Sequence, residues 1–146
     1  MSRRREDAAK RDLHRIATLR HQLASAKMAR LVRHVQAAEH KEQALAEQLR
    51  GLVHETRLAQ SACLSKVTDN LSGLGVYQGL LRVLDLEIRR TEVRRDMQAE
   101  ECHRLRHALT EERRLLERLE IRLDLYKKML RLARAREMDR RDDQDN

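Results

Sequence analysis

Apolar residues recur through the second half of the chain at alternating intervals of four and three residues. Thirteen of the 17 positions on this spacing are apolar, counting Tyr, Cys and Ala: Tyr77, Leu81, Leu84, Ile88, Thr91, Arg95, Gln98, Cys102, Leu105, Leu109, Glu112, Leu116, Leu119, Leu123, Tyr126, Leu130 and Ala133. A seven-residue repeat kept over this length is typical of a left-handed coiled coil, because a 3.5-residue period keeps one stripe facing a partner helix. The pattern predicts a long helix that needs a second helix to cover its stripe.

The first half of the chain carries a matching stripe, which we expect to supply the partner helix. Its regular part comprises Leu31, Val35, Ala38, Glu42, Leu45, Leu49, Leu52, Thr56, Ala59 and Cys63. Traced toward the N-terminus, this register passes through Met28 and Ala24. Three larger residues lie one position away from it: Ile16, Leu19 and Leu23. This drift predicts a stutter that locally unwinds the supercoil.

The only cluster of turn-forming residues lies near the middle of the sequence. It comprises Asn70, Ser72, Gly73 and Gly75, and glycine there is expected to supply the positive φ that ends a helix. Two arms of similar length joined by a short loop predict antiparallel neighbours. Gly51, in the middle of the first arm, is expected to let the partner helix come close.

The predicted fold is therefore all-α, a long two-helix antiparallel coiled-coil hairpin that folds about residue 73 or 74. It forms a single domain over residues 1–146, with a first arm at about 8–69, a turn at about 70–75, a second arm at about 76–138 and a tail at 139–146. Each arm, at about 1.5 Å per residue, would be roughly 90 Å long.

Composition favours this extended fold over a globular one. Hydrophobic residues make up 40% and charged residues 38% of the chain, yet it has no Phe, Trp or Pro and only two Tyr. A compact core usually draws on large aromatic residues, whereas a helical seam does not. The net charge of +8 points to an acidic partner, which could be nucleic acid, lipid headgroups or an acidic protein. Most of the charge is interleaved and describes a solvated helix surface.

Catalytic motifs are missing from the sequence, and we expect no enzyme. There is no Gly-rich phosphate loop, no Cys-x-x-Cys and no Gly-x-Ser-x-Gly, and a helical rod offers a substrate no shielded pocket. The nearest approach to a metal site comprises Cys102, His103, His107 and Glu111. Because Cys102 belongs to the seam, the favoured interpretation is a solvated histidine pair, with no metal and no cofactor.

The two cysteines, Cys63 and Cys102, fit a reducing compartment. In the predicted hairpin they lie opposite Leu84 and Leu45, too far apart along the helices to form a disulfide. No signal peptide and no apolar run long enough to span a membrane is visible, so we expect a cytoplasmic protein without membrane insertion.

Apolar residues that the seam does not need gather in two zones. Near the turn these are Leu74, Val76, Leu80, Val83 and Leu86. Toward the open end they are Leu115, Ile121, Leu125, Met129 and Leu132 on the second arm and Leu13, Ile16, Leu19 and Leu23 on the first. Two such zones separated by a polar stretch predict two docking sites. The alternative is a locally thicker bundle, such as a four-helix dimer of hairpins.

The start of the second arm resembles the central stalk proteins of type III protein export, the FliJ/YscO-like family of flagella and virulence injectisomes. The resemblance is most visible in the run Val76-Tyr77-Gln78-Gly79-Leu80-Leu81-Arg82-Val83-Leu84-Asp85-Leu86-Glu87-Ile88, which is similar to the family's Tyr-Gln-x-aromatic/aliphatic-aliphatic-x-x-Leu-x-x-x-Ile. The Arg- and Glu-rich segment 115–141 is also similar. Leu80 departs from the aromatic residue that flagellar members carry.

This resemblance implies a non-enzymatic stalk whose terminal end inserts into a hexameric export ATPase. Its turn end would reach an export-gate membrane protein, and some members also bind secretion chaperones. The resemblance places Leu80, Leu84, Glu87 and Thr91 on the gate-contacting face, where the surplus residues Val76 and Val83 join them. At the terminal end, the residues expected to meet the ATPase are Leu13, Leu19, Leu115, Ile121, Leu125, Met129 and Leu132.

Two alternatives remain open at the level of sequence. One is a structural coiled coil in which open helices pair as a long parallel dimer. The other is a basic helical protein that binds nucleic acid, which is less favoured because the Arg3–Arg20 region contains Glu6, Asp7 and Asp12. These carboxylates would repel phosphate, and no aromatic platform is present for base stacking.

Overall fold

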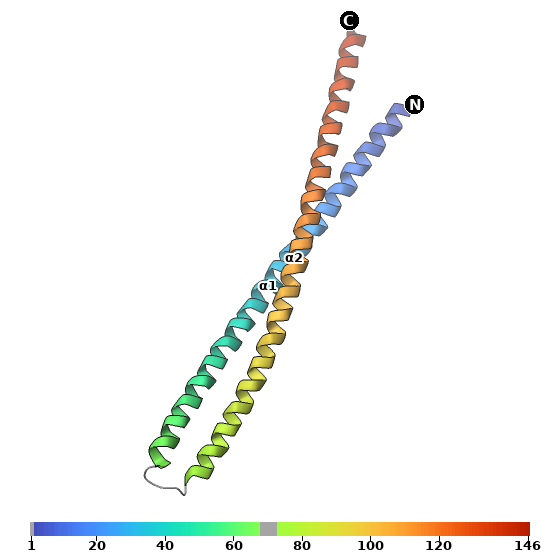
Figure 1. Ribbon diagram of the computed structural model, residues 1–146. Coiled ribbons are helices and arrows are strands. Elements are labelled where there is room, and N and C mark those ends of the chain that lie inside the picture. Colours follow the sequence, from blue (N-terminus) through green and yellow to red (C-terminus); the bar gives the residue numbers. More distant parts are fainter. Residues whose placement is uncertain (1, 68–72) are drawn as a thin grey trace. The chain divides into compact units, whose positions relative to one another are not determined.

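The computed structural model describes residues 2–67 and 73–146 of the chain. Two long helices account for nearly all of these residues, α1 over Ser2–Val67 and α2 over Leu74–Asp145 (Figure 1). No strand occurs among them. The helices pack against each other, which confirms the predicted all-α two-helix hairpin.

Both helices extend beyond the predicted bounds of the arms. Helix α1 begins at Ser2 rather than near residue 8, and α2 runs through the predicted tail to Asp145. Neither terminal segment contains Pro or Gly, so nothing interrupts the i to i−4 ladder. Ion pairs between side chains one helical turn apart also occur near both termini. Lys10 Nζ lies 4.0 Å from Asp7 Oδ1, and Arg141 Nη2 lies 3.3 Å from Glu137 Oε1.

Half of the predicted turn, residues 70–72, lies outside the described residues. Of its two glycines, Gly75 lies within α2 and Gly73 directly precedes it. None of the described glycines has a positive φ, so the left-handed conformation expected at Gly73 and Gly75 is not adopted. A glycine inside the first turn of a helix keeps helical angles because the backbone ladder of α2 already begins there.

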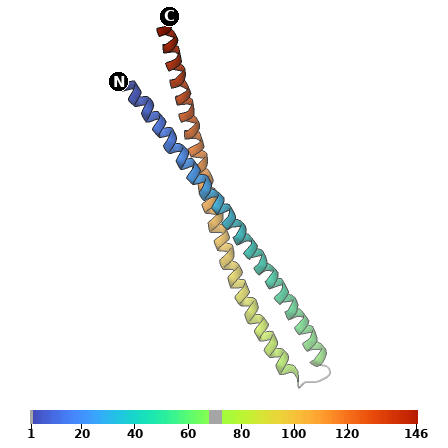
Figure 2. The ribbon, with the colours of Figure 1, turned by 180° about the vertical axis from the view of Figure 1, so that it is seen from behind.

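The chain separates into two compact units, each built from one segment of either helix. Unit 1 comprises the described residues up to Val32 together with 107–146, and unit 2 comprises the described residues of 33–106. In unit 2 the two segments lie side by side in both views (Figures 1 and 2). In unit 1 the helices diverge toward the termini, and every described residue before Asp7 or after Ala133 is exposed.

The seam of α2 follows the predicted register throughout. All 17 positions from Tyr77 to Ala133 are buried or half-buried, including the polar residues Thr91 and Glu112. A single 3,4 spacing thus accounts for the covered stripe of this helix in both units. The predicted second-helix seam is confirmed.

The predicted stutter in α1 is wrong. The regular register from Cys63 to Leu31 continues through Met28 and Ala24 without a break. Five further residues on the same spacing are buried or half-buried: His21, Ala17, His14, Lys10 and Asp7. The three larger residues that suggested the drift are exposed instead: Ile16 at 46%, Leu19 at 54% and Leu23 at 71%. The seam of a continuous helix keeps its phase even where small or polar residues occupy it, since the turn angle per residue is fixed.

Polar contacts across the seam show that the helices are antiparallel in each unit. In unit 1, Lys27 Nζ lies 2.7 Å from Glu112 Oε1, and His21 Nε2 lies 3.4 Å from Glu120 Oε1. The residue later in α2, Glu120, therefore meets the residue earlier in α1, His21, as an antiparallel pair requires.

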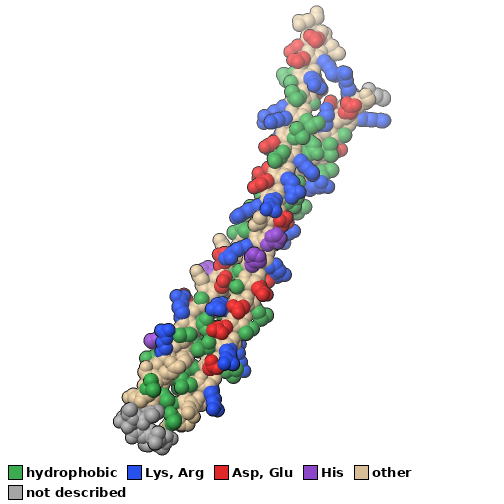
Figure 3. All heavy atoms as spheres, viewed as in Figure 1, with side chains coloured by type: hydrophobic (Ala, Val, Ile, Leu, Met, Phe, Trp, Pro, Cys, Tyr) green, Lys and Arg blue, Asp and Glu red, His purple; other side chains and the backbone are tan. Residues whose placement is uncertain are grey.

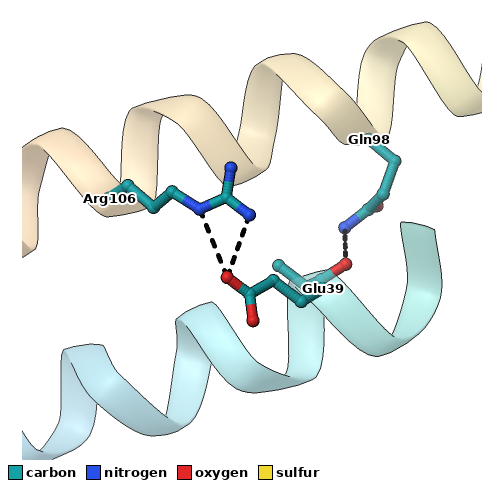
Figure 4. A network of polar contacts seen from close by, with 4 residues as sticks. Glu39, Gln98 and Arg106 are labelled. Carbon is teal, nitrogen blue, oxygen red and sulfur yellow. Dashed lines mark hydrogen bonds and ion pairs between the residues drawn. The ribbon is translucent and has the colours of Figure 1, made fainter. Parts of the chain in front are cut away.

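In unit 2 the same ordering holds between Glu39 and Arg106 and between Lys66 and Tyr77. Arg106 donates through Nη2 to Glu39 Oε1 at 2.9 Å, and Lys66 Nζ lies 5.5 Å from the centre of the Tyr77 ring. Gln98 adds a bond from its side-chain amide to the backbone carbonyl of Ala38 at 3.1 Å (Figure 4). These contacts fix the register of α2 against α1 in this unit.

Both cysteines are free thiols. The expected role of Gly51 needs correction. Gly51 is exposed, and a Cβ built on it would meet nothing within 4 Å. It faces outward along α1 and does not mediate a close approach of α2.

Candidate functional site

All seven residues predicted for the terminal docking surface are exposed in unit 1. They are Leu13 and Leu19 of α1 and Leu115, Ile121, Leu125, Met129 and Leu132 of α2. None of them belongs to the seam, so none is needed to cover the partner helix. Burying large aliphatic side chains contributes about 1.5–3 kcal/mol each, so this surface retains apolar area that a partner could cover.

Most of the large apolar residues that are exposed in unit 1 directly precede a seam residue. They include Ile16 and Leu23 as well as five residues of the predicted docking surface: Leu13, Leu115, Leu125, Met129 and Leu132. Residues one position before the seam lie on one flank of their helix. Leu19 and Ile121 do not share this position and lie farther from the seam. On the face visible in Figure 3, hydrophobic side chains lie among Lys and Arg along unit 1.

A groove between the two helices of unit 1 brings the two flanks together on one side. It has a volume of about 350 Å³, and its walls include Arg20, Leu23 and Lys27 of α1 and Leu115 and Arg122 of α2. Each of these five residues directly precedes a seam residue. Because the helices are antiparallel, the flank preceding the seam of one helix lies on the same side as that of the other. The apolar flanks of α1 and α2 thus form one surface.

The face predicted to contact an export gate lies in unit 2 and is smaller than expected. Val76, Leu80 and Val83 are exposed, and each directly precedes a seam residue. Glu87 is half-buried and pairs with Arg90 at 3.1 Å.

The remaining two residues of that prediction, Leu84 and Thr91, are seam residues and are buried. Thr91 has no exposed surface at all. Side chains enclosed between two helices cannot contact a partner while the helices remain paired. The accessible face therefore consists of Val76, Leu80, Val83 and Glu87.

Polar residues interrupt the seam in both units. Glu112 is buried in the floor of the groove of unit 1, where Oε1 is bonded to Lys27 and Oε2 has no partner. In unit 2, the hydroxyl of Thr91 is buried and unpaired. Burial raises the pKa of the Cys102 thiol above its ordinary value, and the neighbouring Glu42 carboxylate raises it further. The Glu112 carboxylate and the Thr91 hydroxyl oppose burial, so they lower the stability of the helix pair relative to an aliphatic seam.

The residues considered for a metal site lie in different environments. Cys102 is fully buried between the helices, whereas His103 and His107 are both exposed. Within residues 2–67 and 73–146, no three His, Cys, Asp or Glu side chains gather closely enough to hold a metal ion. Neither described helix contains a segment long and apolar enough to cross a membrane.

The groove also contains residues that the sequence prediction did not assign to a docking zone: Arg20, Ala24, Lys27, Glu112, Leu119 and Arg122. A signal for the three basic residues was present, because each directly precedes a seam residue, as Leu23 and Leu115 do. The other three are seam residues.

Comparison of this chain with models of known protein families, with curated proteins and with solved structures gave no match.

Proposed function

We propose that this chain is a non-enzymatic central stalk of a type III protein export apparatus. Unit 1 inserts into the centre of a hexameric export ATPase, and the turn end of unit 2 contacts the export-gate membrane protein. Support comes from the resemblance of segment 76–88 to this family, from the two-helix hairpin and from the two exposed apolar zones. In this role the chain works in the cytoplasm, peripheral to the export apparatus of the inner membrane.

The observation that carries the proposal is the exposure of large aliphatic side chains along both helices of unit 1. Ile121, Leu125 and Leu132 of α2 are well exposed, as are Leu19 and Leu23 of α1. A solvated spacer would place polar residues at these positions, because an exposed apolar patch favours association. A stalk held inside a protein ring would have such residues covered by the ring.

The distribution of charge supports an acidic partner for this unit. Residues 1–32 contain nine Lys and Arg against three Asp and Glu, and residues 107–146 contain eleven against ten. Unit 1 therefore carries a net charge of +7 out of the +8 of the whole chain. Complementary charge accelerates association and makes it sensitive to salt.

The turn end supports a second, smaller contact. Val76, Leu80 and Val83 are exposed aliphatic residues on one flank of α2. Behind them, Leu84 and Thr91 are enclosed in the seam and hold α2 against α1. A gate protein would meet the exposed flank, and secretion chaperones are a further class of partner for the same hairpin.

Capture of partners from a lysate of the source cells tests the proposal. The tagged chain is expected to recover a hexameric ATPase, and the double variant Ile121→Ser, Leu125→Ser is expected to lose it. The matched control is Leu58→Ser, Val93→Ser in unit 2, whose side chains are similarly exposed at 58% each. Recovery of no ATPase by the unsubstituted chain, or equal recovery by both double variants, would contradict the proposal.

The charge of unit 1 also favours a second candidate, a basic helical protein that binds nucleic acid. A duplex of random sequence is the probe for it. A nucleic-acid-binding protein would bind the duplex with an affinity that falls steeply between about 50 and 200 mM salt. A stalk would bind it weakly at both concentrations, because the carboxylates interleaved along α2 repel phosphate.

A further inference from the structure

The groove of unit 1 has an apolar interior and a basic rim. Its floor is formed by Ala24, Leu119 and Glu112, all buried, and Leu23 and Leu115 rise on either side as exposed walls. A concave apolar surface between two helices fits the projecting side chains of a third helix, which insert between them.

The apolar walls continue beyond the groove along both helices by the heptad repeat. On α1, Leu13 lies seven residues before Arg20 and Ile16 lies seven before Leu23. On α2, Met129 lies seven residues after Arg122 and is preceded by Leu125. Residues seven apart lie on nearly the same side of a helix. The apolar flank therefore extends for several helical turns, which suits an elongated helical partner rather than a single side chain.

The charges along the groove are almost all positive. Arg20, Lys27 and Arg122 line it, and Glu112 is the one acidic residue among its lining residues. The carboxylate of Glu112 is already buried and bonded to Lys27 at 2.7 Å. The exposed rim thus presents guanidinium groups, which form their strongest hydrogen bonds with carboxylates.

We propose that this groove binds an amphipathic helix of another protein, whose apolar stripe is flanked by Asp or Glu. The inference rests on the proposed function in that it places a docking site in unit 1, and it adds the chemistry of the partner. The partner's aliphatic residues cover Leu23 and Leu115, and its carboxylates meet Arg20 and Arg122.

Charge and shape argue against the other occupants. A second copy of this chain would bring basic rims together, which repel each other. A bilayer surface is not concave, so it does not fill a groove between two helices. An acidic amphipathic helix satisfies both the apolar walls and the basic rim.

Designed peptides test the inference on the full chain by fluorescence anisotropy. The first peptide is a labelled amphipathic helix with a Leu stripe flanked by Glu, the second has the same stripe flanked by Lys, and the third keeps Glu but replaces Leu by Ser. The Glu-flanked Leu peptide is expected to bind at least about tenfold more tightly than either control peptide. A tenfold difference in Kd corresponds to about 1.4 kcal/mol of binding free energy.

Variants of the chain locate the binding. Leu23→Ser and Leu115→Ser are each expected to weaken the Glu-flanked peptide about tenfold, whereas Leu64→Ser is expected to change nothing. Leu64 is the matched control, because it is 72% exposed in unit 2 and Leu23 is 71% exposed in unit 1. The double variant Arg20→Gln, Arg122→Gln is expected to weaken binding and to flatten its dependence on salt. Helical circular dichroism confirms that each variant is folded.

Four outcomes would overturn the inference. These are equal binding of the Glu- and Lys-flanked peptides, unchanged binding of the Glu-flanked peptide to the Leu23→Ser variant, preferential binding of anionic vesicles through Leu23, and a dimer of this chain at low salt that Leu23→Ser abolishes. The proposed function can fail separately. If the peptide binds the groove but no ATPase is captured, the export role fails and the groove stands. If the ATPase is captured equally by Leu23→Ser, Leu115→Ser, the groove fails and the export role stands.

Discussion

Thr91 lies fully enclosed between the helices of unit 2, and its hydroxyl has no hydrogen-bond partner. An unsatisfied buried hydroxyl costs about 1–3 kcal/mol, and Val has nearly the same shape. Thr91→Val is therefore expected to raise the free energy of unfolding by about 1 kcal/mol. Urea denaturation followed by helical circular dichroism measures the change.

Thr56 provides the matched control for this prediction. It also lies in the seam of unit 2, but its hydroxyl donates to the carbonyl of Leu52 at 2.8 Å. Thr56→Val removes this bond and is expected to lower the free energy of unfolding or to leave it unchanged. A loss of stability in Thr91→Val would show that its hydroxyl is bonded in solution.

The stability of the helix pair is expected to depend on pH through Cys102. Burial and then the neighbouring Glu42 carboxylate raise the pKa of the Cys102 thiol, so the folded state keeps its proton at a pH where the unfolded chain has lost it. The favourable contribution is complete below the unfolded pKa, about 8.5, and is lost as the pH rises through the folded pKa. Stability is therefore expected to fall above about pH 8.5 by more in the parent chain than in Cys102→Ala.

Alkylation tests the burial of Cys102 directly. Cys63 is half-buried and Cys102 is fully buried, and only the thiolate reacts with iodoacetamide. At pH 8 Cys63 is expected to be modified first, as peptide mass spectrometry would show. Faster modification of Cys102 would contradict its burial between the helices.

Helix α1 shows what the sequence could and could not specify about an element. Its existence and its seam from Leu31 to Cys63 followed from the 3,4 spacing and are confirmed. The position of the seam in the N-terminal part of α1 did not follow from the sequence. The largest aliphatic residues there, Ile16 and Leu23, lie off the seam, while Ala17 and His21 lie on it. Hydrophobicity alone assigns the larger residues to the interior. Helix continuity keeps the smaller ones there.

Gly51 tests the stability of α1 as an element. It lies in the helix interior, is exposed, and a Cβ at this position meets nothing within 4 Å. Since Gly is less favourable than Ala in a helix by about 0.8–1 kcal/mol, Gly51→Ala is expected to stabilise the fold by up to that amount. Thermal unfolding measures it, and Gly79→Ala, equally open in α2, should behave alike. A destabilised Gly51→Ala would indicate that another helix packs there.

At the scale of the whole molecule, the asymmetry of charge decides how the docking surface behaves. The sequence was sufficient to find the exposed aliphatic residues of unit 1, since they are surplus to the seam. It was not sufficient to place Arg20 and Arg122 beside them, because that requires knowing which flanks of two antiparallel helices share a side. The family resemblance placed Leu84 and Thr91 on the gate-contacting face, although the seam register marks them as enclosed, and both are buried.

Self-association should consequently depend on ionic strength. Unit 1 carries a net charge of +7, so at about 50 mM salt, where the Debye length exceeds 10 Å, repulsion between basic rims is expected to keep the chain monomeric. At about 1 M salt the Debye length falls to about 3 Å, and the exposed Leu23, Leu115 and Leu125 are then expected to drive weak dimerisation. Sedimentation equilibrium measures both states.

The double variant Leu23→Ser, Leu125→Ser should remain monomeric at high salt, whereas the control double variant Leu58→Ser, Leu64→Ser should still dimerise. A structural coiled coil formed between chains would instead be dimeric at every salt concentration, because its interface is the seam itself.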